Sequence, residues 1–263
     1  MTNPKLSLPS HLEAAIQPLK HIQALQHFDT IDSTNREAMR QLEAGVESGQ
    51  VVIADQQSAG RGRLGRVWHS MQDSLAMSII LRPDIAVEHA PQLSLVTAVA
   101  IHQALIPDVP DIRLKWPNDL LIHGAKVAGI LTEMRTTSKH VDGIVIGIGV
   151  NIKKPLEGWP DDIQQQATDL QSHAISTVSP SSCAMRILES LDQWYEIYLQ
   201  QGFAPIRKAW WQAHIASQQK VRVFNGKAYI TGIATDLDHD GALLLDVHGD
   251  IQRITAGEIF LNE

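Results

Sequence analysis

The densest group of chemically active side chains lies at residues 60–66, which read GRGRLGR. Glycines let the backbone adopt unusual dihedral angles, so successive N–H groups can converge on an anion, and arginines add charge-assisted donors suited to phosphate. The segment predicts a loop that closes over a phosphate-bearing ligand and shields a water-sensitive intermediate. A solvated, flexible connection explains the same residues equally well, and the loop alone does not decide between the two.

The same glycines match two nucleotide-binding fingerprints, and both matches are coincidental. The dinucleotide fingerprint needs its third glycine to open a helix, whereas residues 66–81 lead into a predicted strand. The protein-kinase fingerprint needs a VAIK-like strand, an HRD loop and a DFG triplet, none of which occurs in the sequence. A second glycine pair, Gly147 and Gly149, also fails because Lys-Lys-Pro follows where a helix would have to begin.

Further polar side chains stand at predicted turns and strand ends. They are DSTN (32–35) at a helix N-terminus, KWPND (115–119) around a proline turn, Lys126 at the start of one strand and Asn151 at the end of another. Taken singly, they have ordinary explanations as a helix cap, a turn residue or a solvated strand end. Together they supply cations, amides and one carboxylate at positions where sites usually form.

Composition excludes several classes of partner. The net charge of −7, from 22 basic and 29 acidic residues, argues against nucleic acid as the main partner. No apolar run approaches the roughly eighteen residues of a membrane span, and the N-terminus lacks a secretory signal pattern. The single cysteine, Cys183, cannot form an internal disulfide, which indicates a reducing compartment, and its place at a helix start favours inert packing. We therefore expect a cytoplasmic protein with no membrane or DNA partner.

Periodicity predicts alternating strands and helices before residue 217. Strands are expected at 51–54, 74–81, 112–116, 127–133 and 143–152. Helices are expected at about 11–26, interrupted by Pro18, and at 35–44, 91–106, 180–201 and 204–216. A capping box, Thr34-x-x-Glu37, is expected to begin the helix at 35–44.

The pattern changes near residue 217. Apolar and polar residues then alternate between the turn dipeptides Asn225-Gly226, Asp240-Gly241 and His248-Gly249, which predicts a small antiparallel barrel or sandwich. Residues 236–241 begin like a calcium loop, but the twelfth position is Val247 where a bidentate glutamate is required. A tight turn is the preferred explanation.

The motifs DSTN, QQSAGRGRLGRVW, KWPNDLL, KVAGILTE and GIGVNI occur in the order and approximate spacing of the biotin–protein ligases, which the chain therefore resembles over about residues 28–261. The later TAGEI is similar too. The resemblance implies an α/β (α+β) fold. Its catalytic domain, at 1–216, would be mixed-sheet and class II synthetase-like, with an N-terminal extension at about 1–27. An SH3-like β-barrel would follow at 217–263.

The resemblance also implies an activity. Such enzymes activate biotin with MgATP as biotinyl-5′-AMP and transfer it to a lysine of the biotin carboxyl carrier protein of acetyl-CoA carboxylase. Only 32 residues precede Ser33, too few for the winged helix-turn-helix of bifunctional members, so a monofunctional ligase without a repressor function is expected. Lipoyl or octanoyl ligation is the alternative enzyme activity, and a non-catalytic biotin sensor or carrier-binding module is the alternative of another class. The oligomeric state stays open, with a homodimer as one alternative.

The resemblance assigns roles to individual residues. Biotin would be bound by Ser33, Thr34, Asn35, Gln57, Arg61, Gly62, Arg63 and Lys126. The ATP or adenylate side would be bound by Arg61, Arg63, Arg66, Trp68, Lys115, Asn118, Asp119 and Asn151. The catalytic residues would be Lys126, Arg63 and Asp119, and no residue is assigned to a metal. Lys126 would stabilise charge on the carboxyl and phosphoryl oxygens. Asp119 would orient or deprotonate the incoming lysine, which is almost fully protonated near neutral pH.

Overall fold

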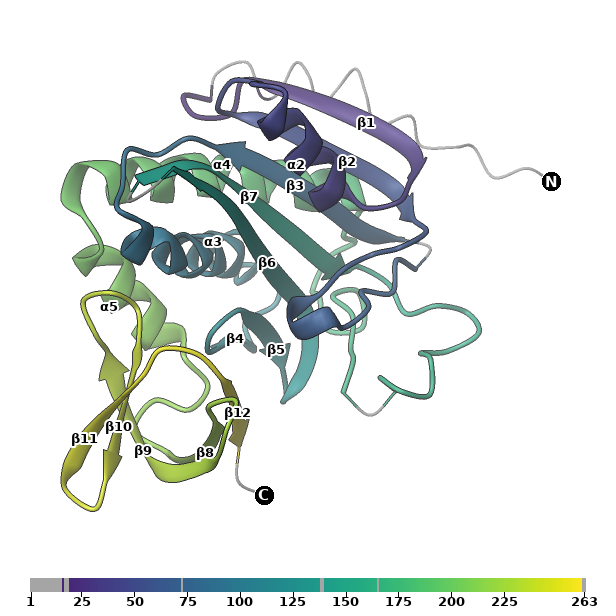
Figure 1. Cartoon of the computed structure of the whole chain (residues 1–263). Helices are drawn as coiled ribbons and strands as arrows, with labels where there is room; N and C mark the ends of the chain where they lie inside the picture. The colour runs from purple at the N-terminus through teal and green to yellow at the C-terminus, as the bar shows by residue number, and fades with distance from the viewer. Residues whose placement is uncertain (1–15, 17–18, 72, 138–139, 165, 262–263) are drawn as a thin grey trace.

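A computed structural model describes residues 16, 19–71, 73–137, 140–164 and 166–261, whose strands form two sheets (Figure 1). The larger sheet has seven strands in the order β1-β2-β3-β7-β6-β5-β4. These are β1 (Ala24–Ile31), β2 (Gln50–Gln57), β3 (Ser74–Leu81), β4 (Ile112–Lys115), β5 (Asp119–Ile122), β6 (Ala125–Thr137) and β7 (His140–Asn151). Only β1 and β2 pair in parallel, so the sheet is mixed as predicted.

Helices cover both faces of this sheet. They are α2 (Thr34–Glu43), α3 (Ala90–Leu105), α4 (Pro180–Gln201) and α5 (Ala204–Ala213). On one face α2 packs on Val52, Ile80 and Val145 in a small core, while α3 and α4 contribute to the main core on the other. Because both faces are covered, every residue of β3 is buried, which explains its nearly continuous apolar sequence. Among the described helices, none is long and apolar enough to cross a membrane.

The smaller sheet is antiparallel, in the order β11-β10-β9-β8-β12. Its strands are β8 (Lys220–Phe224), β9 (Tyr229–Leu237), β10 (Leu243–Val247), β11 (Asp250–Ile254) and β12 (Glu258–Leu261). The predicted hairpin turns are confirmed, because the glycines of all three turn dipeptides have positive φ. Asp238 and Asp240 both pair with Arg253, which favours the turn over a calcium loop. The domain boundary at 216/217 stays a prediction.

Most predicted elements before residue 217 are confirmed. The strands at 51–54, 74–81, 112–116, 127–133 and 143–152 correspond to β2, β3, β4, β6 and β7, and the last four predicted helices to α2–α5. Two strands, β1 and β5, were not predicted. The predicted helix at 11–26 is wrong at 19–26: residues 19–23 are irregular and 24–26 belong to β1. Its residues 11–15 and 17–18 lie outside the described residues. The packing role of Cys183 is confirmed, since the thiol is fully buried and burial raises its pKa to about 12.

The capping-box prediction is wrong. Ser33, not Thr34, is the N-cap of α2, and no side chain caps this helix. The Thr34 hydroxyl instead donates to Oε1 of Gln57, at 3.1 Å. The Thr34 side chain, which was expected to cap α2, therefore contacts strand β2 instead.

Two buried histidines make the fold sensitive to acid. Burial lowers the pKa of His102, in α3, from its ordinary 6.5 to about 4, and that of His214, after α5, to about 4. Both are about 5% exposed. Because the unfolded chain binds protons near pH 6.5 and the folded chain only near pH 4, the unfolded state takes up more protons between these values. The free energy of unfolding therefore falls as the pH is lowered through this window.

We expect His102→Leu to reduce this pH dependence. Between pH 7.5 and pH 5, the loss of unfolding free energy should be smaller in the variant than in the wild type by about 2 kcal/mol, because one buried neutral histidine is gone. Urea unfolding at the two pH values measures this difference. His89→Gln, at a more exposed histidine, is the control and should match the wild type. An unchanged difference in His102→Leu would contradict the explanation.

Candidate active site

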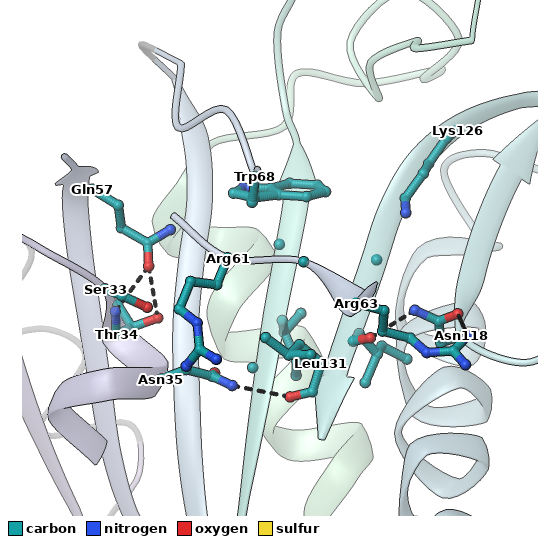
Figure 2. A pocket seen from close by; sticks show the side chains of 16 residues that line it. Ser33, Thr34, Asn35, Gln57, Arg61, Arg63, Trp68, Asn118, Lys126 and Leu131 are labelled. Carbon is teal, nitrogen blue, oxygen red and sulfur yellow. Dashed lines mark hydrogen bonds between the residues drawn. The ribbon is translucent and has the colours of Figure 1, made fainter. Parts of the chain in front are cut away.

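A small cavity lies over β6 and β7, between the N-terminus of α2 and the loop that joins β2 to β3 (Figure 2). Ten of the fourteen residues predicted from the sequence line it: Ser33, Thr34, Asn35, Gln57, Arg61, Gly62, Arg63, Trp68, Asn118 and Lys126. The rest of the lining consists of Gly129, Ile130, Leu131, Gly147, Ile148 and Gly149. The structure thus brings together motifs that are spread over more than a hundred positions of the sequence.

Glycines form the floor of this cavity. A Cβ atom at Gly147 would lie 2.0 Å from Oδ1 of Asn35, and one at Gly149 would lie 2.4 Å from the Trp68 indole. Neither distance is sterically possible, so the two glycines let an amide and an aromatic ring lie directly on the sheet. Both glycines are inside β7, which confirms that they are not a nucleotide-binding turn.

One end of the cavity is a network of amides and hydroxyls. Oε1 of Gln57 accepts from the backbone N–H of Thr34, at 2.8 Å, as well as from its hydroxyl. The buried Ser78 hydroxyl lies 2.8 Å from Oγ1 of Thr34 and 2.7 Å from Oδ1 of Asn35. Nδ2 of Asn35 in turn donates to Oε2 of Glu133, at 3.0 Å. These bonds fix the orientation of both amide side chains, and Figure 2 shows the Gln57 amide nitrogen turned toward the cavity.

The glycine–arginine loop covers the cavity and is attached at several points. Arg61 pairs with Glu133 of β6, at 2.9 Å, and Arg66 forms two hydrogen bonds with Glu258 of β12, at 2.6 and 3.3 Å. Partial burial opposes ionisation of Glu258, but its contacts with Arg66 keep its pKa below the ordinary value. These ion pairs attach the loop at two points, while Arg61 and residues 64–67 remain exposed to solvent.

Arg63 differs from the other two arginines because its hydrogen-bond partner is neutral. Its Nη1 donates to Oδ1 of Asn118, at 2.8 Å. Burial lowers the pKa of Arg63, an effect that the nearby Asp119 and Glu258 partly offset. A half-buried guanidinium that faces an amide retains its charge for a further anion, and its planar donors match a phosphate group.

The indole of Trp68 fills much of the space. It packs on Gly149 and lies below Lys126, whose Nζ is 6.0 Å from the ring centre. Figure 2 shows the ring between Gln57 and Lys126. The free volume is about 50 Å³, well below the roughly 300 Å³ of a small-molecule site. With the loop and the indole in this position, the cavity is smaller than such a site.

The four predicted residues that do not line the cavity lie beside it. Nζ of Lys126 forms an ion pair with Oδ1 of Asp119, at 2.6 Å. Asn151 holds the backbone near Lys126 by donating to the carbonyl of Thr168, at 3.0 Å. Lys115 and Arg66 lie at Glu258, the lysine Nζ being 4.0 Å from Oε1. An anion that paired with Lys126 in place of Asp119 would release the Asp119 carboxylate from this ion pair.

A second cavity, of about 260 Å³, adjoins the first. Arg63, Asn118 and Ile130 line both, so the Arg63–Asn118 hydrogen bond lies at their common boundary. Its other walls include the start of α3. They also include Gly241, between β9 and β10, and Thr255, between β11 and β12. The C-terminal segment thus reaches the edge of the site.

Three contributing residues were not predicted: Ser78, Glu133 and Glu258. Ser78 carries a usable signal, because it is a hydroxyl in an otherwise apolar, fully buried strand. Glu133 and Glu258 lie within the motifs KVAGILTE and TAGEI, but nothing local indicates that they pair with loop arginines.

Comparison with known proteins gives a consistent picture. Residues 27–151 match the biotin/lipoate A/B protein ligase family, and residues 219–262 match the biotin protein ligase C terminal domain. The bifunctional ligase/repressor BirA of Bacillus subtilis is 37% identical over 91% of this chain and 74% of its own length. The biotin–[acetyl-CoA-carboxylase] ligase of Paracoccus denitrificans is 37% identical over 87% of this chain and 97% of its own length. The structure of a biotin protein ligase from Aquifex aeolicus in complex with biotin and ATP aligns with a TM-score of 0.77 and 27% identity, over 91% of this chain and 98% of that chain.

The attachment of the loop to the C-terminal segment can be tested with Glu258→Gln. Loss of the carboxylate removes the ion pair with Arg66, and a partly exposed pair of this kind contributes up to about 1 kcal/mol. We expect trypsin to cleave the loop at its arginines up to about fivefold faster, with global stability little changed. Glu157→Gln, at an exposed carboxylate, is the matched control. Equal cleavage rates in all three proteins would show that Glu258 does not hold the loop.

Proposed function

Since the chain belongs to the biotin/lipoate A/B protein ligase family, we propose that it is a biotin–protein ligase. It activates biotin with ATP as biotinyl-5′-AMP and then transfers biotin to a lysine of the biotin carboxyl carrier protein of acetyl-CoA carboxylase. Relatives named biotin–[acetyl-CoA-carboxylase] ligase support this acceptor, and complexes of relatives with biotin and ATP or with biotinyl-5-AMP support the two substrates and the intermediate.

One observation supports biotin as the substrate: the two ends of the cavity carry different kinds of side chain. Amides and hydroxyls of Thr34, Asn35 and Gln57 stand at one end, and the cations of Arg63 and Lys126 stand at the other. Biotin has a urea at one end and a carboxylate at the other, and a urea needs both donors and acceptors. Neither the methyl end of octanoate nor the dithiolane ring of lipoate offers the N–H and C=O groups of a urea, so both would leave the polar end unpaired and fit less well.

In the first half-reaction, a biotin carboxylate oxygen attacks the α-phosphorus of ATP. A P–O bond to the carboxylate forms and the bond to pyrophosphate breaks. We assign Lys126 and Arg63 to the carboxylate and phosphoryl oxygens, whose developing charge they would stabilise. Arg61, Gly62 and Trp68 would cover the adenylate and exclude water, and Asn118, Lys115 and Arg66 would lie toward the nucleotide.

Magnesium is expected with ATP, and the charges around the cavity indicate how it would be held. None of the cavity-lining residues that the structure describes carries a carboxylate. Asp119, Glu133 and Glu258, which lie nearby, are paired with cations. The residues do not fit a protein-held Mg²⁺ ion, and we propose that the ion comes bound to the ATP phosphates.

In the second half-reaction, the acceptor lysine nitrogen attacks the acyl carbon of biotinyl-5′-AMP. A C–N bond forms, the C–O bond to phosphate breaks, and AMP leaves. We propose that the adenylate phosphate binds Lys126 and so releases Asp119 from its ion pair. The freed carboxylate then orients the acceptor ammonium and receives its proton.

The proposal includes no DNA-binding role and places the protein in the cytoplasm. The relative from Bacillus subtilis is named as a repressor as well as a ligase. The net charge of −7 supports ligase activity alone, because operator binding needs an excess of basic residues.

The direct test is pyrophosphate–ATP exchange by the purified protein with biotin, lipoate or octanoate. We expect exchange with biotin alone, because only biotin satisfies both ends of the cavity. Exchange with lipoate or octanoate instead would reassign the substrate. No exchange with any of the three, from folded protein, would favour a binding module over an enzyme.

Asp119→Asn tests the role of the carboxylate in transfer. We expect transfer from preformed biotinyl-5′-AMP to the carrier protein to fall by about 100-fold, which is typical for loss of a general base. Biotin-dependent exchange should fall far less, because Lys126 retains its charge. Single-turnover transfer measures the first rate, and full transfer by the variant would exclude the assignment.

A further inference from the structure

Four side chains form a contiguous group on the outer face of the smaller sheet, here called the aromatic patch: Arg222, Phe224, Tyr229 and Phe260. They come from β8, β9 and β12. Arg222 is opposite Phe260 in register, and Phe224 is opposite Tyr229. The Arg222 guanidinium lies 4.7 Å from the Tyr229 ring and 5.7 Å from the Phe260 ring. The patch is thus a cation packed against two aromatic rings that also contact each other.

The patch is not needed for the core of this domain. Val221 and Val223 alternate with Arg222 and Phe224 along β8 and are fully buried on the opposite face of the strand. Tyr229 is 57% exposed, and Arg222 is exposed as well. Tyrosine, phenylalanine and arginine are the side chains enriched in protein–protein interfaces, where the rigid rings contribute most of the binding energy.

The patch is continuous with the active site. Nζ of Lys115 lies 6.0 Å from the Phe260 ring centre. Lys115 is paired in register with Asp119, whose carboxylate holds Lys126. Figure 1 shows β12 on the side of the smaller sheet that faces β4 and β5, with β11 on the opposite side. A protein bound at the patch would therefore lie beside the group assigned to the acceptor lysine.

We propose that the aromatic patch is a docking surface for the acceptor protein, which it contacts through a carboxylate-bearing surface next to the target lysine. The inference rests on the proposed function. A macromolecular acceptor has to bind around the site opening. Arg222 of β8 and Lys227 of the turn that follows it are exposed cations in a chain whose net charge is −7, whereas Lys115 already lies 4.0 Å from Glu258. Charge complementarity therefore selects an acidic surface on the partner.

The test compares the double variant Arg222→Ser/Tyr229→Ser with the wild type. Ile251→Ser is the matched control, because Ile251 is also 57% exposed but lies on β11, the opposite edge strand. Three rates are measured: biotin-dependent pyrophosphate–ATP exchange, aminolysis of the adenylate by hydroxylamine, and transfer to purified biotin carboxyl carrier protein. The first two need no docking.

We expect the double variant to raise KM for the carrier protein by about tenfold, with kcat, exchange and aminolysis within about twofold of the wild type. Ile251→Ser should leave all of these values unchanged. An unchanged carrier KM in the double variant would overturn the inference. So would a wild-type dimer in sedimentation equilibrium that the double variant abolishes while transfer persists, because the patch would then bind a second copy of the chain. Absence of exchange in the wild type would instead contradict the proposed function.

Discussion

The active site depends on a steric constraint, the lack of Cβ atoms at the centre of the large sheet. Gly129 of β6 and Gly149 of β7 lie opposite each other in register, and together they leave a flat strip of backbone. The Trp68 indole and the Lys126 side chain lie on this strip, and Asn35 approaches Gly147 on the same strand. A methyl group at any of these positions would push a functional side chain away from the others. The sheet is therefore both the hydrophobic scaffold and the floor of the cavity.

Electrostatics then determines how the loop lies on this floor. A loop with three arginines would repel itself and the nearby lysines if it were not neutralised. Glu133 and Glu258 neutralise Arg61 and Arg66, whereas Arg63 faces the uncharged Asn118. This arrangement leaves the half-buried Arg63 with an uncharged hydrogen-bond partner, while the outer two arginines attach the loop to β6 and β12. The charge of Lys126 is likewise balanced, by the carboxylate of Asp119.

The sequence predicted the parts of the fold that have strong local patterns. Buried strands such as β3 are continuous apolar runs, and hairpins carry turn glycines. By contrast, β1 lies at the sheet edge with half of its side chains exposed, and β5 has only four residues, so neither produces a clear period. Family motifs indicated which residues meet at the cavity. The ion pairs of the loop span 72 and 192 positions of sequence, and no local pattern connects such distant carboxylates to particular arginines.

The smaller sheet is joined to the site by more than chain connectivity. Glu258 of β12 contacts Arg66 on the loop and Lys115 on β4, and Lys115 is the register partner of Asp119. One partly buried carboxylate therefore links three segments of the chain: β12, the loop and β4. Because Glu258 neutralises a loop arginine, a displacement of the smaller sheet would change the electrostatic cost of moving the loop. The C-terminal segment is consequently coupled to the loop and to β4 through the ion pairs of Glu258, although most of its residues lie outside the cavity.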